Sequence, residues 1–205
     1  TEGDRRANAF TYTLNEGTKA ANYEIATVEG TLTVTELTDK VTVTITENSG
    51  SEKYDGSEKT VTGYKVSIDN SLYTEADFTF SGTDSVTGTD AGSYDMELKA
   101  ADFTNISENI TNVEFVIVDG TLEISKRTVT LTSADAEKVY DGTALTRNQQ
   151  TDVTVTGDGF VDGEGATYDV TGSQTEVGSS ANAFTYTLNE GTKAANYEIA
   201  TVEGT

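Results

Sequence analysis

The sequence predicts a mainly β protein built from small tandem repeats, and three observations support this prediction. Threonine alternates with apolar residues in many short stretches, which is the two-residue period of a strand with one buried face. Gly, Asp and Asn separate these stretches as turn residues do. The segment ANAFTYTLNEGTKAANYEIATVEGT also occurs at both 7–31 and 181–205 without a substitution, which indicates a periodic array.

The strands are predicted from alternation. In VTVTIT at 41–46, Val41, Val43 and Ile45 lie on one face and three threonines on the other. The same pattern predicts strands in VEFVIV (113–118), TLEI (121–124), VTVT (153–156), FTYTL (184–188) and YDMEL (94–98). In both copies of FTYTL we expect the apolar stripe to lie in the core: Phe10, Tyr12 and Leu14, and Phe184, Tyr186 and Leu188.

Helical signal is confined to two short stretches. LYTEADF at 72–78 offers Thr74 as an N-cap with acidic residues behind it, and AADFTNIS at 100–107 predicts another short turn. We therefore favour tandem β-sandwich repeats of immunoglobulin-like type, arranged as an elongated rod. A β-grasp-like α+β repeat with one short helix is the alternative, and it is favoured if 72–78 is helical.

Internal alignment divides the chain into three parts. NYEIATVEGTLTV at 22–34 aligns with NVEFVIVDGTLEI at 112–124, and EKYDGS at 52–57 aligns with EKVYDGT at 137–143, giving units of about 85 residues. The identical segments begin 174 residues apart, so two diverged repeat types alternate. We expect 1–36 to be the C-terminal half of a preceding repeat, 37–126 a complete repeat, and 127–205 a repeat lacking its last strand.

Composition excludes several classes of function. With 35 acidic and 13 basic side chains the net charge is −22, which argues against nucleic-acid binding and against anionic membranes. The chain has no Cys and no His, so thiolate and imidazole chemistry are absent, and no apolar run is long enough for membrane insertion. We predict no catalytic residues and no cofactor, and hence no enzyme.

The two Tyr-Asp-Gly sequences predict structural turns. An Asp side chain can accept a hydrogen bond from a backbone N–H two residues on, Gly tolerates positive φ, and Tyr supplies apolar surface. The turn residues are Tyr54, Asp55 and Gly56, and Tyr140, Asp141 and Gly142. Asn196 and its equivalents Asn22 and Asn112 precede strands, where we expect local backbone bonding.

Two further kinds of site have candidate residues. Asp158, Asp162 and Glu164 share the loop GDGFVDGEG and are candidate Ca²⁺ ligands, although the loop lacks Asp-x-Asp-x-Asp-Gly spacing. Asp84 and Asp90 form a second, sparser acidic loop. Lys65, in a strand-like segment, is the candidate for an intramolecular Lys–Asn cross-link, which requires a buried lysine.

At KVYDGT and at AANYEI with EGTLTV, the sequence resembles the YDG-type and MBG-type (mucin-binding-protein-like) tandem repeats of bacterial cell-surface proteins. TGSQTEVG at 171–178 fits the glycine-rich middle of such repeats. The complete repeat departs from the pattern, because SGTDSVTGTDAGSYD (81–95) replaces that stretch and Val113 replaces the tyrosine after Asn. The resemblance implies an exported stalk or adhesin repeat at the bacterial cell surface.

Two functions follow from the resemblance. The first is a structural spacer that presents an adhesive or other module away from the cell, with neighbouring repeats as partners; it should bury Tyr54, Tyr140 and Tyr197. The alternative is a module that binds host glycan or protein, which should expose Tyr or Phe in a patch. The open ends should either fray or complement one another head-to-tail between molecules, with the segment around 31–35 as donor.

Overall fold

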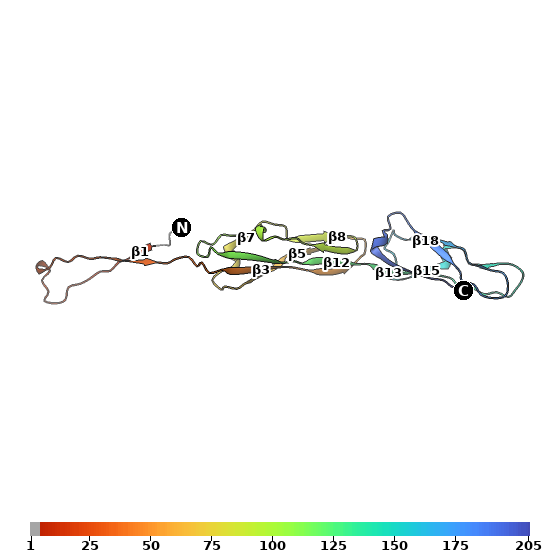
Figure 1. Ribbon diagram of the computed structural model, residues 1–205, viewed down its shortest axis with the longest axis horizontal. Coiled ribbons are helices and arrows are strands. Elements are labelled where there is room, and N and C mark those ends of the chain that lie inside the picture. Colours follow the sequence, from red (N-terminus) through yellow and green to blue (C-terminus); the bar gives the residue numbers. More distant parts are fainter. Residues whose placement is uncertain (1–4) are drawn as a thin grey trace. The chain divides into compact units, whose positions relative to one another are not determined.

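The computed structural model describes residues 5–205 and confirms a mainly β protein (Figure 1). Strands of two to seven residues are joined by loops, and each helical element is a single 3₁₀ turn. The strands are β1 (Arg5–Asn8), β2 (Gly30–Thr33), β3 (Val41–Glu47), β4 (Gly50–Lys53), β5 (Lys59–Thr62), β6 (Tyr64–Ile68), β7 (Phe78–Phe80), β8 (Ser85–Gly88), β9 (Gly92–Asp95), β10 (Phe103–Asn105), β11 (Val113–Val118), β12 (Thr121–Ser125), β13 (Arg127–Ser133), β14 (Leu145–Thr146), β15 (Val153–Gly157), β16 (Ala166–Val170), β17 (Ser173–Gln174), β18 (Phe184–Leu188) and β19 (Tyr197–Val202).

The helical turns are η1 (Ala20–Asn22), η2 (Glu75–Asp77), η3 (Ala100–Asp102), η4 (Gln150–Asp152) and η5 (Ala194–Asn196). At η2, Thr74 and Asp77 form a reciprocal capping box, as the N-cap signal predicted. Because the stretch 72–78 contains only this one turn, the α+β alternative loses the observation that would favour it.

The chain forms two compact units, and residues 37–126, which the sequence predicts to be one complete repeat, contribute to both. Unit 1 comprises residues 1–45, 66–82 and 99–117. Its three-stranded sheet has the order β11-β3-β6, and its core includes Val41, Val43 and Ile45, none of which is exposed. The inward face of VTVTIT is therefore the predicted one. Unit 1 also contains a group of aromatic side chains that contact one another: Tyr73, Phe78, Phe103 and Phe115.

Unit 2 comprises residues 46–65, 83–98 and 118–205. In one sheet, β12 lies between β4, which it pairs with in parallel, and β9, which it pairs with in antiparallel fashion. This central position leaves Leu122 fully buried and Ile124 only 3% exposed. In a second sheet of order β15-β13-β19, Val129 and Leu131 of β13 form the corresponding core.

The predicted strand YDMEL ends earlier than alternation suggests. Strand β9 stops at Asp95, because Glu97 has a φ of +62° and turns the chain out of the extended conformation. Met96 and Leu98 are still buried, and the Leu98 N–H donates to the buried carboxylate of Glu47 at 2.7 Å. The Gly120 N–H donates to the other oxygen of this carboxylate, also at 2.7 Å.

The doubled segment has two different conformations. In the second copy FTYTL forms β18, paired with β16, and Phe184 is 9% exposed, while Leu188 is half-buried and Tyr186 is 38% exposed. In the first copy the same residues form no strand, and Phe10 and Tyr12 are both more than half exposed. The prediction of a core stripe is thus wrong for Phe10 and Tyr12, because a strand buries a face only against a partner. It is also wrong for Tyr186, which stays exposed although β18 has a partner strand.

Candidate functional site

The two Tyr-Asp-Gly turns have the same backbone geometry. The Ser57 N–H donates to Asp55 Oδ1 at 2.9 Å, and Gly56 has a φ of +81°. In the second turn the Thr143 N–H donates to Asp141 Oδ1 at 2.9 Å, and Gly142 has a φ of +78°. These side-chain bonds and the positive φ explain why Asp and then Gly occur in these turns.

The tyrosines that precede these turns differ in burial. Tyr54 is 4% exposed, whereas Tyr140 is 58% exposed. The expectation that Tyr140 is buried is therefore wrong. The reason is that residues of the following repeat cover Tyr54, and no described residue takes that place at Tyr140. The surroundings of Tyr54 define a cluster within unit 2, which we call the junction cluster: Lys53, Tyr54, Asp90, Arg127, Asp158, Glu164, Asn196 and Tyr197.

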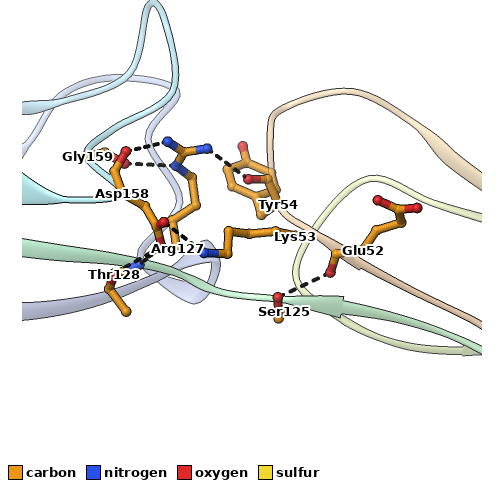
Figure 2. A network of polar contacts seen from close by, with 8 residues as sticks. All are labelled: Glu52, Lys53, Tyr54, Ser125, Arg127, Thr128, Asp158 and Gly159. Atoms are coloured by element: carbon orange, nitrogen blue, oxygen red, sulfur yellow. Dashed lines mark hydrogen bonds and ion pairs between the residues drawn. The ribbon is translucent and has the colours of Figure 1, made fainter.

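Arg127 is the first residue of β13 and connects the turn of one repeat to a loop of the next (Figure 2). Its Nε donates to the Gly159 carbonyl at 2.9 Å, and Nη2 donates to the Asp158 carbonyl. In the other direction, Nη1 donates to the Tyr54 carbonyl at 3.4 Å. The planar guanidinium thus holds three backbone carbonyls from two repeats, which a lysine could not do with the same geometry.

Asp158 adds an ion pair beside this arginine. Its Oδ1 accepts from Lys53 Nζ at 2.7 Å, and Oδ2 accepts from the backbone N–H of Thr128 at 2.9 Å and from its hydroxyl at 3.0 Å. The hydrogen bond from Lys53, followed by those from Thr128, holds the pKa of Asp158 well below its usual range. The pair joins the last residue of β4 to the loop after β15 (Figure 2).

Tyr54 and Tyr197 share one carboxylate. The Tyr54 hydroxyl donates to Glu164 Oε1, and the Tyr197 hydroxyl donates to Glu164 Oε2 at 2.8 Å. The two rings meet edge to face with centroids 5.7 Å apart, and Phe160 contacts Tyr197 at 5.0 Å. Tyr197 is 3% exposed, so this contact forms a small aromatic core between sequence repeats.

We expect Tyr54 to give the junction a distinct alkaline transition. Burial away from water, and then the hydrogen bond to Glu164, raise the pKa of Tyr54 to about 12. Because the unfolded pKa is about 10, this stabilisation is complete below pH 10 and is lost as pH rises toward the folded pKa. A pH titration followed by phenolate absorbance should show a tyrosine that ionises late, and Tyr54→Phe should remove it. Raising the pH above 10 should lower the free energy of unfolding of this variant by less than that of the unsubstituted chain. Unchanged late titration in Tyr54→Phe would contradict the assignment.

A second polar contact joins the loop before β9 to the segment before β19. Asn196 is fully buried; its Oδ1 accepts from the Ala91 N–H at 2.8 Å, and its Nδ2 donates to Asp90 Oδ1 at 2.9 Å. Lys193 Nζ lies 2.6 Å from the other oxygen of Asp90. The hydrogen bond from Lys193, and then that from Asn196, lower the pKa of Asp90. The prediction of purely local bonding is wrong for Asn196, which bonds across the sequence repeats.

The candidate calcium ligands are not brought together as a metal site. Asp158 and Glu164 are engaged in the separate bonds described above, and Asp162 is exposed in the turn between them. Within residues 5–205, no group of three or more acidic side chains could hold a metal ion. Lys65 is exposed, so it does not meet the burial that a Lys–Asn cross-link requires.

Sequence reasoning missed Arg127 and the partner role of Asp90. One signal could have revealed Arg127: RTVTLTS (127–133) aligns with VTVTITE (41–47), so an arginine stands where the preceding repeat has the fully buried Val41. A charge at an inward strand position needs partners, and here the partners are backbone carbonyls. Asp90 carries no such signal, because its partners lie more than a hundred residues away.

The fold and the junction cluster define a β-rich repeat module whose sequence-related segments meet through ordered contacts. Residues 40–126 match the family model of the MBG domain, so this segment of the chain is similar to MBG domains. The family is associated with surface proteins. Comparisons with curated proteins and with solved structures gave no significant match. In the part of the chain that the structure describes, no helix is long and apolar enough to cross a membrane.

Proposed function

We propose that the chain is a structural spacer of an exported bacterial surface protein and that it acts without catalysis. The observation that supports this proposal is the junction cluster. It joins the end of one repeat to the next through a guanidinium, two ion pairs, a buried amide and an aromatic contact. A flexible linker would need none of these contacts, whereas a spacer that holds direction needs a defined junction.

Burial in the MBG repeat also supports a spacer over a ligand-binding module. Between residues 37 and 126 the large apolar side chains with high exposure are aliphatic, namely Leu72, Ile106, Val116 and Val118. Binding patches for glycans and proteins are built around exposed aromatic side chains. In this repeat Tyr54, Tyr73, Phe78 and Phe103 are instead buried, and the other aromatic side chains are half-buried.

Spin-label distances across the junction test the proposal. The chain has no Cys, so Thr60→Cys and Thr185→Cys place labels at two exposed positions on opposite sides of the junction cluster. We expect a single narrow distance distribution, which broadens when Tyr54→Ala and Arg127→Ala are combined. A distribution that is already broad with the cluster intact would overturn the proposal. Retention of the chain on a glycan array or on immobilised mucin would support the binding alternative instead.

A further inference from the structure

In unit 1, the segment that opens the complete repeat runs in the same direction as the segment that closes it. Leu37 forms a parallel bridge with Ile110. Further along, the Val41 N–H donates to the Asn112 carbonyl at 2.9 Å, and β3 and β11 then continue as neighbours in one sheet. The opening and closing segments therefore advance together from this end of their contact.

Unit 2 has the same arrangement in the next part of these two segments. Strands β4 and β12 pair in parallel, from Gly50 opposite Leu122 to Lys53 opposite Ser125. The Tyr54 N–H extends this pairing, because it donates to the Ser125 carbonyl at 2.9 Å. Since β3 leads into β4 and β11 leads into β12, the opening and closing segments of the repeat contact each other in parallel in both units.

Side chains join the two segments between the end of β3 and the start of β12. The buried carboxylate of Glu47 accepts the Gly120 N–H at 2.7 Å, and the Ser49 hydroxyl accepts the Thr121 N–H at 3.1 Å. A Cβ on Gly120 would clash with the Asn48 carbonyl oxygen, so the two backbones approach each other closely here. Hydrogen bonds between the segments thus continue where the backbone pairing of β4 and β12 has not yet begun.

From this topology, we propose that the complete repeat bears tension, with segments 37–54 and 109–125 as its mechanical clamp. Tension along the chain pulls the opening segment backward at Leu37 and the closing segment forward at Lys126. Because the segments are parallel, these forces act in opposite directions along the strands and load the bonds between them together. In an antiparallel pair both forces would act at one end of the contact, and the bonds would break one after another.

The following repeat opens with the same arrangement. Strand β13 pairs in parallel with β19, from Arg127 opposite Tyr197 to Thr132 opposite Val202. Lys126 alone separates β12 from β13, so tension that leaves one clamp enters the next without a flexible linker. The clamp lies within a repeat, whereas the proposed spacer role rests on the junction cluster between repeats. A flexible junction would therefore contradict the spacer and leave the clamp intact.

Pulling the same protein in two directions tests the clamp. The chain has no Cys, so Asp39→Cys with Lys126→Cys attaches handles at the opening and closing ends of the repeat. The matched control, Asp39→Cys with Thr111→Cys, attaches both handles beside the bridge of Leu37 and Ile110, at one end of the contact. In single-molecule pulling at equal speed, we expect the first pair to need at least about twofold more force, because several backbone bonds must break together.

Urea denaturation of the same variants separates pulling direction from stability. Asp39, Thr111 and Lys126 are exposed, so both double-cysteine chains should unfold at the midpoint of the unsubstituted chain. With equal midpoints, a difference in force can come only from the direction of loading. Thr38→Cys with Glu123→Cys repeats the loading from opposite ends at other exposed positions and should again need the higher force. Equal forces in the two directions, or a lower force from opposite ends, would overturn the proposal.

Discussion

Tyr54→Ala is expected to lower the free energy of unfolding by about 3–5 kcal/mol, the range for removing a buried aromatic ring. The ring is 4% exposed, packs edge to face on Tyr197 and donates a hydrogen bond to Glu164. Its removal leaves a cavity between two sequence repeats and removes one donor from a half-buried carboxylate. Urea denaturation followed by circular dichroism measures the loss.

The chain provides its own control for this substitution. Tyr140 occupies the same place in the second Tyr-Asp-Gly turn but is 58% exposed. Tyr140→Ala in the monomer should therefore change the free energy of unfolding by no more than about 0.5 kcal/mol. Since the two turns have matching backbone geometry, a large difference reports the junction and not the turn. Similar losses in both variants would show that the tyrosine acts only within its own turn.

The predictable part of the fold is local. Alternation places β3, β11, β12, β15 and β18, because a strand with one buried face needs an apolar residue at every second position. The Thr74 N-cap likewise marks η2. The exceptions arise where another segment determines the outcome. Strand β9 ends before Glu97 because the Glu47 carboxylate holds the Leu98 N–H, and nothing in YDMEL itself indicates that contact.

The doubled segment shows most directly why sequence alone is insufficient. The two copies of this segment share 25 identical residues. In the second copy Phe184 and Tyr197 are buried, whereas the equivalent Phe10 and Tyr23 of the first copy are more than half exposed. Local propensity is the same in both copies, so the difference comes entirely from strand partners. For β18 that partner is β16, and for β19 it is β13. Tertiary contacts therefore override local propensity in this chain.

The junction cluster was only partly predictable, for a similar reason. Tyr54 is conspicuous in the sequence as part of a repeated motif, although its motif predicts only a turn. Tyr54 is surrounded by Arg127, the loop 158–164 and Asn196. The spacing of these residues in the sequence does not indicate that they meet. Their convergence depends on β12 and β13 continuing from one repeat into the next, with Lys126 alone between them.

Glu47→Ala is the second substitution with a large expected effect. The carboxylate is 3% exposed, and its two oxygens accept the N–H groups of Leu98 and Gly120, each at 2.7 Å. An alanine leaves both buried N–H groups without an acceptor, at about 1–3 kcal/mol for each group. We therefore expect a loss of about 2–6 kcal/mol in the free energy of unfolding. Glu47→Gln keeps one acceptor oxygen and should lose about half as much.

Hydrogen exchange separates this explanation from a general loss of packing. If the carboxylate acts by binding these two amides, Glu47→Ala should increase exchange at Leu98 and Gly120 more than at the amides of β13. Exposed Glu52, in the neighbouring strand β4, gives the matched control, and Glu52→Ala should leave both stability and exchange nearly unchanged. The second repeat supports the interpretation, because Ser133 stands at the position of Glu47 and its hydroxyl accepts the N–H of Gly204 at 3.0 Å. A uniform rise in exchange across unit 2 would instead mean that Glu47 stabilises the unit as a whole.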